Sequence, residues 1–233
     1  MAHTTPSRTA LLVGATGLVG RELLQLLLAD PRYSAVHCIG RRAPALTHAK
    51  LHTHVLDIHS AADLSKLPAC DDVYIALGTT IKVAGSQEAF KALDLDAVVA
   101  IAQTNITQAA IKNVATACRL GVVSAMGADA KSGVFYNRTK VQMEVAVSAL
   151  GYASVSIARP SMLAGNRQAL AQTARPGEQI GLKLMGAVDF LIPANYKPIE
   201  AADVAKALHN MVSAGTTGVR VALSGELHQL ATA

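Results

Sequence analysis

Tryptophan is absent from this chain of 233 residues, and aromatic residues as a class make up only 3% of it. Nucleic-acid-binding proteins need clustered basic residues, and many interleave them with aromatic side chains that stack on bases. The net charge of +5 comes without such a setting, and Arg41-Arg42 is the basic pair that stands out. No apolar run reaches the roughly 20 residues of a membrane-spanning helix. We therefore expect neither a nucleic-acid nor a membrane partner.

Cysteine is also scarce. The three cysteines, Cys38, Cys70 and Cys118, are odd in number and widely spaced, which matches neither a disulfide framework nor a zinc site. We expect them to be core thiols in a reducing compartment. The polar N-terminus and the apolar run that glycine interrupts after five residues do not resemble a signal peptide. These features predict a cytoplasmic protein.

Histidine is the potential metal ligand that does cluster in the sequence. His48, His52, His54 and His59 lie close together, and His52 and His54 would share one face of a strand. No cysteine or carboxylate pattern completes a ligand set around them. We therefore expect histidines that face solvent at the edge of a sheet, and no metal.

What the sequence does contain is apolar and regularly patterned. Hydrophobic residues make up 51%, and short β-branched runs alternate with helical patterns. This alternation predicts an α/β fold with a doubly wound parallel sheet covered on both faces, within one domain over 1–233 in which 160–233 forms a small C-terminal cap. The predicted strands are 9–13, 35–39, 52–55, 72–77, 120–124, 154–158 and 219–223. The predicted helices are 21–29, 61–67, 87–110, 136–150, 181–191 and 200–212, with 165–177 a loop and 193–198 irregular.

A glycine-rich turn follows the first predicted strand and reads Gly14-Ala-Thr-Gly-Leu-Val-Gly20. Gly14 permits the tight turn, Gly17 lets the backbone approach a pyrophosphate, and Gly20 allows close packing of helix on strand. The N-terminus of the next helix would direct N–H groups and partial positive charge at a phosphate. Strand, turn and helix in this order predict a dinucleotide-binding site.

Three further residues form a candidate catalytic set. Tyr136 and Lys140 lie four residues apart, so they share one face of the predicted helix. A phenol has a pKa near 10, and a neighbouring ammonium lowers it enough for proton exchange with an alcohol or carbonyl. Ser124 ends a predicted strand twelve residues earlier and would hold the substrate oxygen beside the tyrosine.

Together these residues resemble the short-chain dehydrogenase/reductase superfamily. The glycine spacing is similar to its extended and atypical branches. Further motifs resemble the atypical subgroup typified by the Tat-interacting protein of metazoans and its bacterial relatives. These motifs are Ile39-Gly-Arg-Arg42, Ala76-Leu-Gly-Thr-Thr-Ile-Lys82, Ala84-Gly-Ser86, Val134-Phe-Tyr-Asn137, Ala158-Arg-Pro-Ser161, Arg175-Pro-Gly-Glu178 and Lys197-Pro-Ile199.

The resemblance implies a Rossmann-like fold that holds a cofactor, NADP(H), at the C-terminal edge of the sheet. The residues that it places at the pyrophosphate are Gly14, Thr16, Gly17, Leu18 and Val19. It places Asp57 and Ile58 against the adenine, and Leu77, Gly78 and Thr79 on the ribose side after the fourth strand. Tyr136 and Lys140 would meet the nicotinamide ribose, and Pro160 and Ser161 the carboxamide.

The choice between NADP(H) and NAD(H) is predicted from the end of the second strand. NAD sites carry an Asp or Glu there that binds the ribose 2′-hydroxyl. This chain has Gly40-Arg41-Arg42 and no acid. Guanidinium groups pair with phosphate in a forked geometry, so Arg41 and Arg42 favour the 2′-phosphate of NADP(H). The alternative is a solvated basic pair.

The leading hypothesis is an NADPH-dependent oxidoreductase that acts on a carbonyl or the corresponding alcohol of a small molecule. The alternative is a non-catalytic NADP(H)-binding sensor or regulator that binds a protein partner. A third is an epimerase or dehydratase, which usually needs a larger sugar-nucleotide domain than the stretch after 158 offers. The chain is expected to be a monomer or a homodimer.

Overall fold

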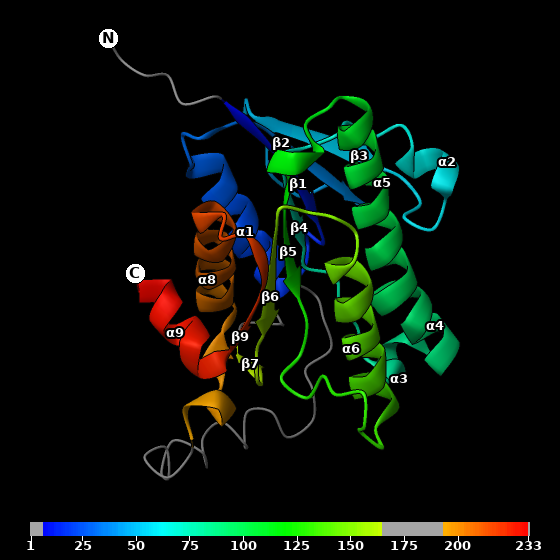
Figure 1. The fold of residues 1–233 in the computed structure, drawn as a ribbon, viewed down its shortest axis with the longest axis vertical. Helices are drawn as coiled ribbons and strands as arrows, with labels where there is room; N and C mark the ends of the chain where they lie inside the picture. Colours follow the sequence, from blue (N-terminus) through cyan, green and yellow to red (C-terminus); the bar gives the residue numbers. More distant parts are fainter. Residues whose placement is uncertain (1–6, 165–192, 233) are drawn as a thin grey trace.

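The computed structural model describes residues 7–164 and 193–232. Seven parallel strands form one sheet in the order β3-β2-β1-β4-β5-β6-β9 (Figure 1). They are β1 (Arg8–Val13), β2 (Tyr33–Gly40), β3 (Leu51–Val55), β4 (Asp72–Ile75), β5 (Arg119–Val123), β6 (Ser154–Arg159) and β9 (Gly218–Leu223). The order confirms the Rossmann-like doubly wound sheet that the sequence predicts.

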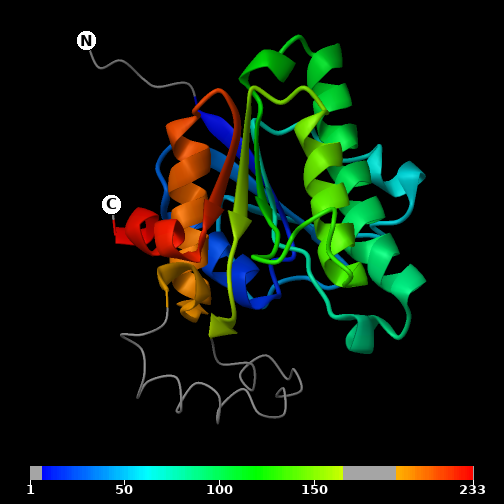
Figure 2. The same ribbon diagram turned by 60° about the horizontal axis from the view of Figure 1, so that its bottom comes forward.

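Helices cover both faces of the sheet, as Figures 1 and 2 show. The helices α1 (Leu18–Ala29), α8 (Ala201–Ala214) and α9 (Ser224–Thr232) lie on one side. The opposite side carries α2 (Ala61–Leu64), α5 (Ala97–Ile111) and α6 (Phe135–Ser148). Two apolar cores therefore sandwich the sheet, and all four residues of the central strand β4 are buried. Burial on both faces explains why central strands such as β1 contain a continuous apolar run in the sequence.

The helix predicted at 87–110 is confirmed, with one feature that the sequence did not reveal. It consists of α4 (Gln87–Lys91), a π-helical turn η1 (Ala92–Asp96) and α5. A short helix α3 (Ile81–Ala84) precedes it, and a 3₁₀ turn η2 (Ala115–Ala117) leads to β5. Single π-helical turns occur frequently at functional sites.

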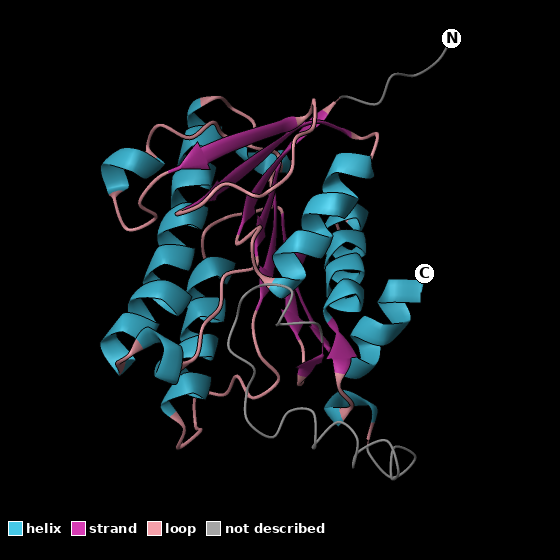
Figure 3. Cartoon of the chain, turned by 180° about the vertical axis from the view of Figure 1, so that it is seen from behind, coloured by secondary structure: helices cyan, strands magenta, loops and turns pink. Residues whose placement is uncertain are grey.

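In the C-terminal part of the chain, α8 and β9 confirm the helix predicted at 200–212 and the strand predicted at 219–223, whereas the rest was not predicted or is not described. The predicted loop at 165–177 and helix at 181–191, with the motif Arg175-Pro-Gly-Glu178, lie outside the described residues. Two-residue strands β7 (Leu163–Ala164) and β8 (Ile199–Glu200) pair with each other, and a 3₁₀ turn η5 (Ala194–Tyr196) precedes β8. Helix α9 was not predicted. Within the predicted cap, β9 joins the main sheet and α8 packs on it, so these elements belong to the layered body (Figure 3).

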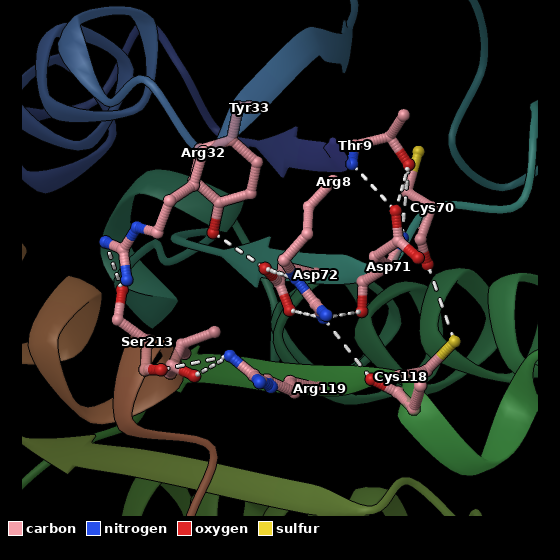
Figure 4. Close-up of polar contacts among 12 residues, drawn as sticks. Arg8, Thr9, Arg32, Tyr33, Cys70, Asp71, Asp72, Cys118, Arg119 and Ser213 are labelled. Carbon is pink, nitrogen blue, oxygen red and sulfur yellow. Dashed lines mark hydrogen bonds and ion pairs between the residues drawn. The ribbon is translucent and has the colours of Figure 1, made fainter. Parts of the chain in front are cut away.

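All seven strands point the same way, so the segments that follow them meet at one edge of the sheet, here named the carboxyl edge. The order of strands reverses between β1 and β4, and open α/β sheets bind ligands in the crevice at such a point. The opposite edge, here named the amino edge, is formed by residues at the starts of β1, β2, β4 and β5 (Figure 4). Among the described residues, no helix has both the length and the apolar character needed to cross a membrane.

Candidate active site

The glycine turn lies at the carboxyl edge, between β1 and α1. Gly14 has a φ of +87°, and a Cβ there would lie 2.6 Å from the carbonyl oxygen of Ala76, which follows β4. A Cβ on Gly20 would overlap the carbonyl oxygen of Gly14. Both positions require glycine because backbone atoms occupy the space of a side chain. The turn therefore packs tightly against the end of β4.

Helix α1 begins directly after this turn. Its N-cap, Gly17, provides no side-chain hydrogen bond to the N–H groups of the first turn, and Thr16 beside it is exposed. Leu18 is half-buried, while Val19 lies on the face of α1 that is buried in the core. Uncapped N–H groups and the helix dipole together suit an anion. This end of the site therefore fits a pyrophosphate.

The remaining residues that the resemblance assigns to a cofactor follow other strands at the same edge. Arg41 and Arg42 are exposed just after β2. Asp57 is exposed and its Oδ1 accepts a hydrogen bond from the N–H of His59 at 3.0 Å, whereas Ile58 is buried. Leu77, Gly78 and Thr79 follow β4. The structure thus gathers these side chains and backbones at the edge where the glycine turn lies.

Pro160 and Ser161 follow β6 and are held by neighbouring loops. The carbonyl oxygen of Pro160 accepts a hydrogen bond from the N–H of Met126 at 3.0 Å. The Ser161 N–H donates to the hydroxyl of Ser224 at 2.7 Å, and its hydroxyl donates to the carbonyl oxygen of Lys197. These bonds connect the end of β6 to the start of α9 and to the segment before β8.

Tyr136 and Lys140 lie one turn apart in α6, as predicted from their spacing. The Lys140 side chain is only 3% exposed, and its Nζ lies 5.9 Å from the centroid of the Tyr136 ring. Tyr136 is half-buried and packs against the buried ring of Phe90, with 5.1 Å between ring centroids. The phenol and the ammonium are therefore neighbours, and helix α4 supports the tyrosine from the side.

The sequence analysis missed Asp94, which lies in the π-helical turn η1. Its carboxylate is fully buried, and Oδ1 forms an ion pair with Lys140 Nζ at 2.6 Å. The other oxygen, Oδ2, accepts a hydrogen bond from the N–H of Thr79 at 3.1 Å. One carboxylate therefore contacts both the candidate catalytic lysine and the loop after β4. An acidic residue within an apolar helical pattern was the available signal in the sequence.

Ser124 has a partner that the sequence prediction did not include. Its hydroxyl donates to Oε1 of the buried residue Glu144. The same Oε1 accepts from Nε of Arg159 at 2.9 Å, and Oε2 of Glu144 accepts from Nη2 of Arg159 at 2.5 Å. Glu144 lies eight residues past Tyr136 in α6, or about two helical turns. The structure therefore gives Ser124 a role in a buried Ser–Glu–Arg cluster. The predicted contact of Ser124 with substrate stays a prediction.

The cysteines and histidines are placed as follows. All three cysteines are buried, and burial raises the pKa of Cys38 and Cys70 to about 12 and that of Cys118 to about 11, so none is a reactive thiolate.

Of the predicted edge histidines, His54 is half-buried, and its Nε2 lies 3.0 Å from Nδ1 of His37. Within 7–164 and 193–232, no group of three or more His, Cys, Asp or Glu side chains is arranged to hold a metal ion.

The fold and this site define a protein of the NAD(P)-binding Rossmann class. Residues 10–181 match the model of the NAD-dependent epimerase/dehydratase family. The chain belongs to this family, and it is an atypical member of the short-chain dehydrogenase/reductase superfamily, as its motifs predict.

Individual relatives agree with this assignment. The chain is 35% identical to the protein fmp52, mitochondrial, of Emericella nidulans over 76% of this chain and 74% of that one. It is 27% identical to the protein HTATIP2 of Rattus norvegicus over 90% and 84% of the two chains. The fold is similar to that of a short chain dehydrogenase from Leptospira borgpetersenii with bound NAD+, with a TM-score of 0.71, 12% identity and coverage of 95% and 93%.

These names correct one prediction. The sequence predicted a cytoplasmic protein from its lack of a signal peptide. The fungal relatives, including that of Candida albicans at 30% identity over 89% of both chains, are named mitochondrial proteins. The prediction of a cytoplasmic location is therefore wrong. A signal-peptide pattern concerns secretion alone, so it does not separate the compartments inside a cell.

Proposed function

We propose that this protein is an NADPH-dependent oxidoreductase that interconverts a carbonyl compound and the corresponding alcohol. The observation that carries the proposal is the pair Tyr136 and Lys140, one turn apart at the start of α6. This helix begins at the edge of the sheet that also holds the uncapped glycine turn. A proton donor and a dinucleotide-binding turn at one edge are the two components that such a reaction needs.

Each residue has a distinct role in carbonyl reduction. Tyr136 transfers its phenolic proton to the carbonyl oxygen, which becomes the hydroxyl of the alcohol. The ammonium of Lys140 stabilises the phenolate that remains and binds the ribose next to the nicotinamide. A bound reduced nicotinamide supplies the hydride that the carbonyl carbon accepts. In alcohol oxidation the phenolate takes the proton back.

The proposed residues at the cofactor follow its length along the carboxyl edge. The turn from Gly14 to Gly20, with Thr16, Gly17, Leu18 and Val19, holds the pyrophosphate on the N–H groups of α1. Arg41 and Arg42 hold the 2′-phosphate, and Asp57 and Ile58 border the adenine. Exposed guanidinium groups and the absence of an acid at the end of β2 support the preference for NADPH over NADH.

Replacement of Tyr136 by Phe tests the proposed chemistry. The variant keeps the ring that packs on Phe90 and loses only the hydroxyl. We expect NADPH affinity within twofold of wild type, and turnover of the carbonyl substrates identified in a panel to fall at least 100-fold. The decrease in NADPH absorbance measures turnover, and unchanged turnover would contradict the proposed mechanism.

The alternative function, a non-catalytic NADP(H)-binding regulator, predicts a different result. A non-catalytic protein would bind NADPH with no turnover of any carbonyl or alcohol in the panel. It would also capture a protein partner only when NADPH is present. We therefore pair the turnover assay with calorimetric titration of the same preparation, so that binding without chemistry is recognised.

A further inference from the structure

We infer that Asp94 is the positioning residue for the nicotinamide half of the site, where it fixes the ammonium of Lys140 and the backbone of Thr79 together. The inference rests on the proposed function, because it assigns Lys140 to the nicotinamide ribose. Asp94 touches neither cofactor nor substrate in this account, and it acts through the two groups that do.

The burial of both charges is the first argument. Asp94 is 0% exposed and Lys140 is 3% exposed, with 2.6 Å between Oδ1 and Nζ. Removing two charges from water is costly, and apolar replacements of a buried ion pair are often as stable or more stable. A buried pair is therefore weak as a device for stability alone. Its place beside the Tyr136 ring gives it another use, because a fixed ammonium is what the phenolate requires.

The second argument comes from the other carboxylate oxygen. Oδ2 of Asp94 accepts the N–H of Thr79 at 3.1 Å, and Thr79 lies in the loop that follows β4. Gly78, directly before it, is exposed, and a Cβ there would lie 3.9 Å from Asp94 Oδ1. The carboxylate thus connects the loop after β4 to the lysine of α6. Loss of the carboxylate would leave both groups without this partner.

The third argument is the local backbone. Asp94 is the middle residue of the π-helical turn η1, which packs against α6, whereas the residues on either side are α-helical. A π-helical turn inserts an extra residue into a helix, is rare, and frequently occurs at functional sites. In the same turn Asp96 is exposed and pairs with Lys91 at 2.8 Å on the surface. One turn therefore carries two acidic residues in opposite environments.

This pair of aspartates gives a matched experiment. Asp94→Asn keeps the shape of the side chain and removes its charge, and Asp96→Asn makes the same change on the exposed side. Calorimetry would measure the binding of NADPH and of adenosine 2′,5′-bisphosphate, a probe that has the adenine and 2′-phosphate but no nicotinamide. Circular dichroism would first show that each variant is folded.

We expect Asp94→Asn to weaken NADPH at least tenfold and to leave adenosine 2′,5′-bisphosphate within twofold of wild type. Asp96→Asn should leave both affinities unchanged. Equal NADPH affinity in wild type and folded Asp94→Asn would overturn the inference and leave the proposed function intact. A wild type that binds neither probe would overturn the proposed function itself, and the inference with it.

A second comparison covers the case in which Asp94→Asn does not fold because Lys140 is left buried without a counter-charge. The variant Lys140→Gln would then be compared with Lys140→Gln combined with Asp94→Asn. If Asp94 acts through Lys140, the second substitution causes less than a twofold further loss of NADPH affinity. A further loss of fivefold or more would overturn the inference, because Asp94 would then act independently.

Discussion

The two edges of the sheet use charge in different ways. At the amino edge, the guanidinium of Arg8 forms a two-pronged contact with Asp72, at 2.8 and 2.6 Å. These bonds raise the pKa of Arg8, and the phenol of Tyr33 donates to the same carboxylate at 2.8 Å. Asp72 is only 1% exposed, so its charge is fully committed to these partners (Figure 4).

The rest of the amino edge is closed in the same manner. Arg32 binds both oxygens of Asp30. It also donates to the hydroxyl of Ser213, and Arg119 donates to the carbonyl oxygens of Val212 and Ser213 (Figure 4). These bonds join α8 to the starts of β2 and β5. Every one of these charges has a protein partner, so the edge contributes to stability.

The carboxyl edge is open by comparison. The first turn of α1 has no side-chain cap, and among the described residues none forms an ion pair with the exposed Arg41 or Arg42. The buried pair Asp94 and Lys140 lies beside the ring of the candidate proton donor, Tyr136. The comparison teaches that polar groups without internal partners mark the ligand edge better than the number of charges does.

The largest effect is expected where the amino edge is broken. Asp72→Ala leaves Arg8 without its counter-charge and removes the carboxylate that accepts from Tyr33. We expect a loss of about 3 to 5 kcal/mol in the free energy of unfolding, measured by urea denaturation. Lys91→Ala, which removes an exposed pair, should change it by less than about 1 kcal/mol. NADPH affinity of the folded Asp72→Ala protein should stay within twofold, and a tenfold loss would contradict the division of roles.

The opposite result is expected when the open arginines are removed. Replacement of Arg41 and Arg42 by Ala should weaken NADPH about 10- to 100-fold, equivalent to about 1.4 to 2.7 kcal/mol, because the 2′-phosphate loses its forked partners. NADH affinity and the urea midpoint should change little. Calorimetric titration of both nucleotides gives the answer, and equal losses for NADPH and NADH would sink the assignment.

A smaller effect is expected at Ser124, which has a structural hydrogen bond to Glu144 and a predicted contact with the substrate oxygen. Ser124→Ala removes the hydrogen bond to Glu144 and leaves the contacts of Glu144 with Arg159 in place. A structural role predicts a loss of about 1 kcal/mol in stability and a turnover that falls less than threefold. If turnover instead falls 100-fold while the urea midpoint is unchanged, Ser124 holds the substrate oxygen as its position in the sequence predicted.

The smallest effect concerns His209, which lies between Asp30 and Tyr74 at the amino edge. Burial lowers the pKa of His209, so the unfolded chain binds a proton at higher pH than the folded protein does. Stability should therefore decrease as the pH falls below about 6.5, the ordinary histidine pKa, toward the lower pKa of the folded state. Urea midpoints between pH 5 and 8 should show this slope in wild type and a flatter one in His209→Asn. Identical slopes would contradict the assignment.

Local patterns were sufficient to predict the sheet and the glycine turn. Buried strands such as β4 produce apolar runs, and the spacing of Gly14 and Gly20 is visible within one turn, although the contact of Gly14 with Ala76 is not. Tyr136 and Lys140 were predictable because their spacing places them on one helix face. The alternation of strands and helices predicted a parallel sheet covered on both faces, and the order of its strands came from the structure.

Contacts between distant segments were not predictable in this way. Asp94 meets Lys140 only because η1 packs against α6, and no local pattern in the sequence encodes the π-helical turn. Ser124 was assigned from its place after β5, whereas its hydroxyl is directed to Glu144 by the packing of α6 on the sheet. The network at the amino edge likewise joins Arg8, Asp72 and Tyr33, which lie far apart in the chain.

The central claim is that the open carboxyl edge binds a nicotinamide dinucleotide and prefers the one with a 2′-phosphate. Titration calorimetry of the wild-type protein with NADPH and, separately, with NADH tests it most directly. The account predicts tight binding of NADPH and binding of NADH that is at least tenfold weaker. Failure to bind either nucleotide would contradict it, because the glycine turn would then serve only the packing of α1 against the sheet.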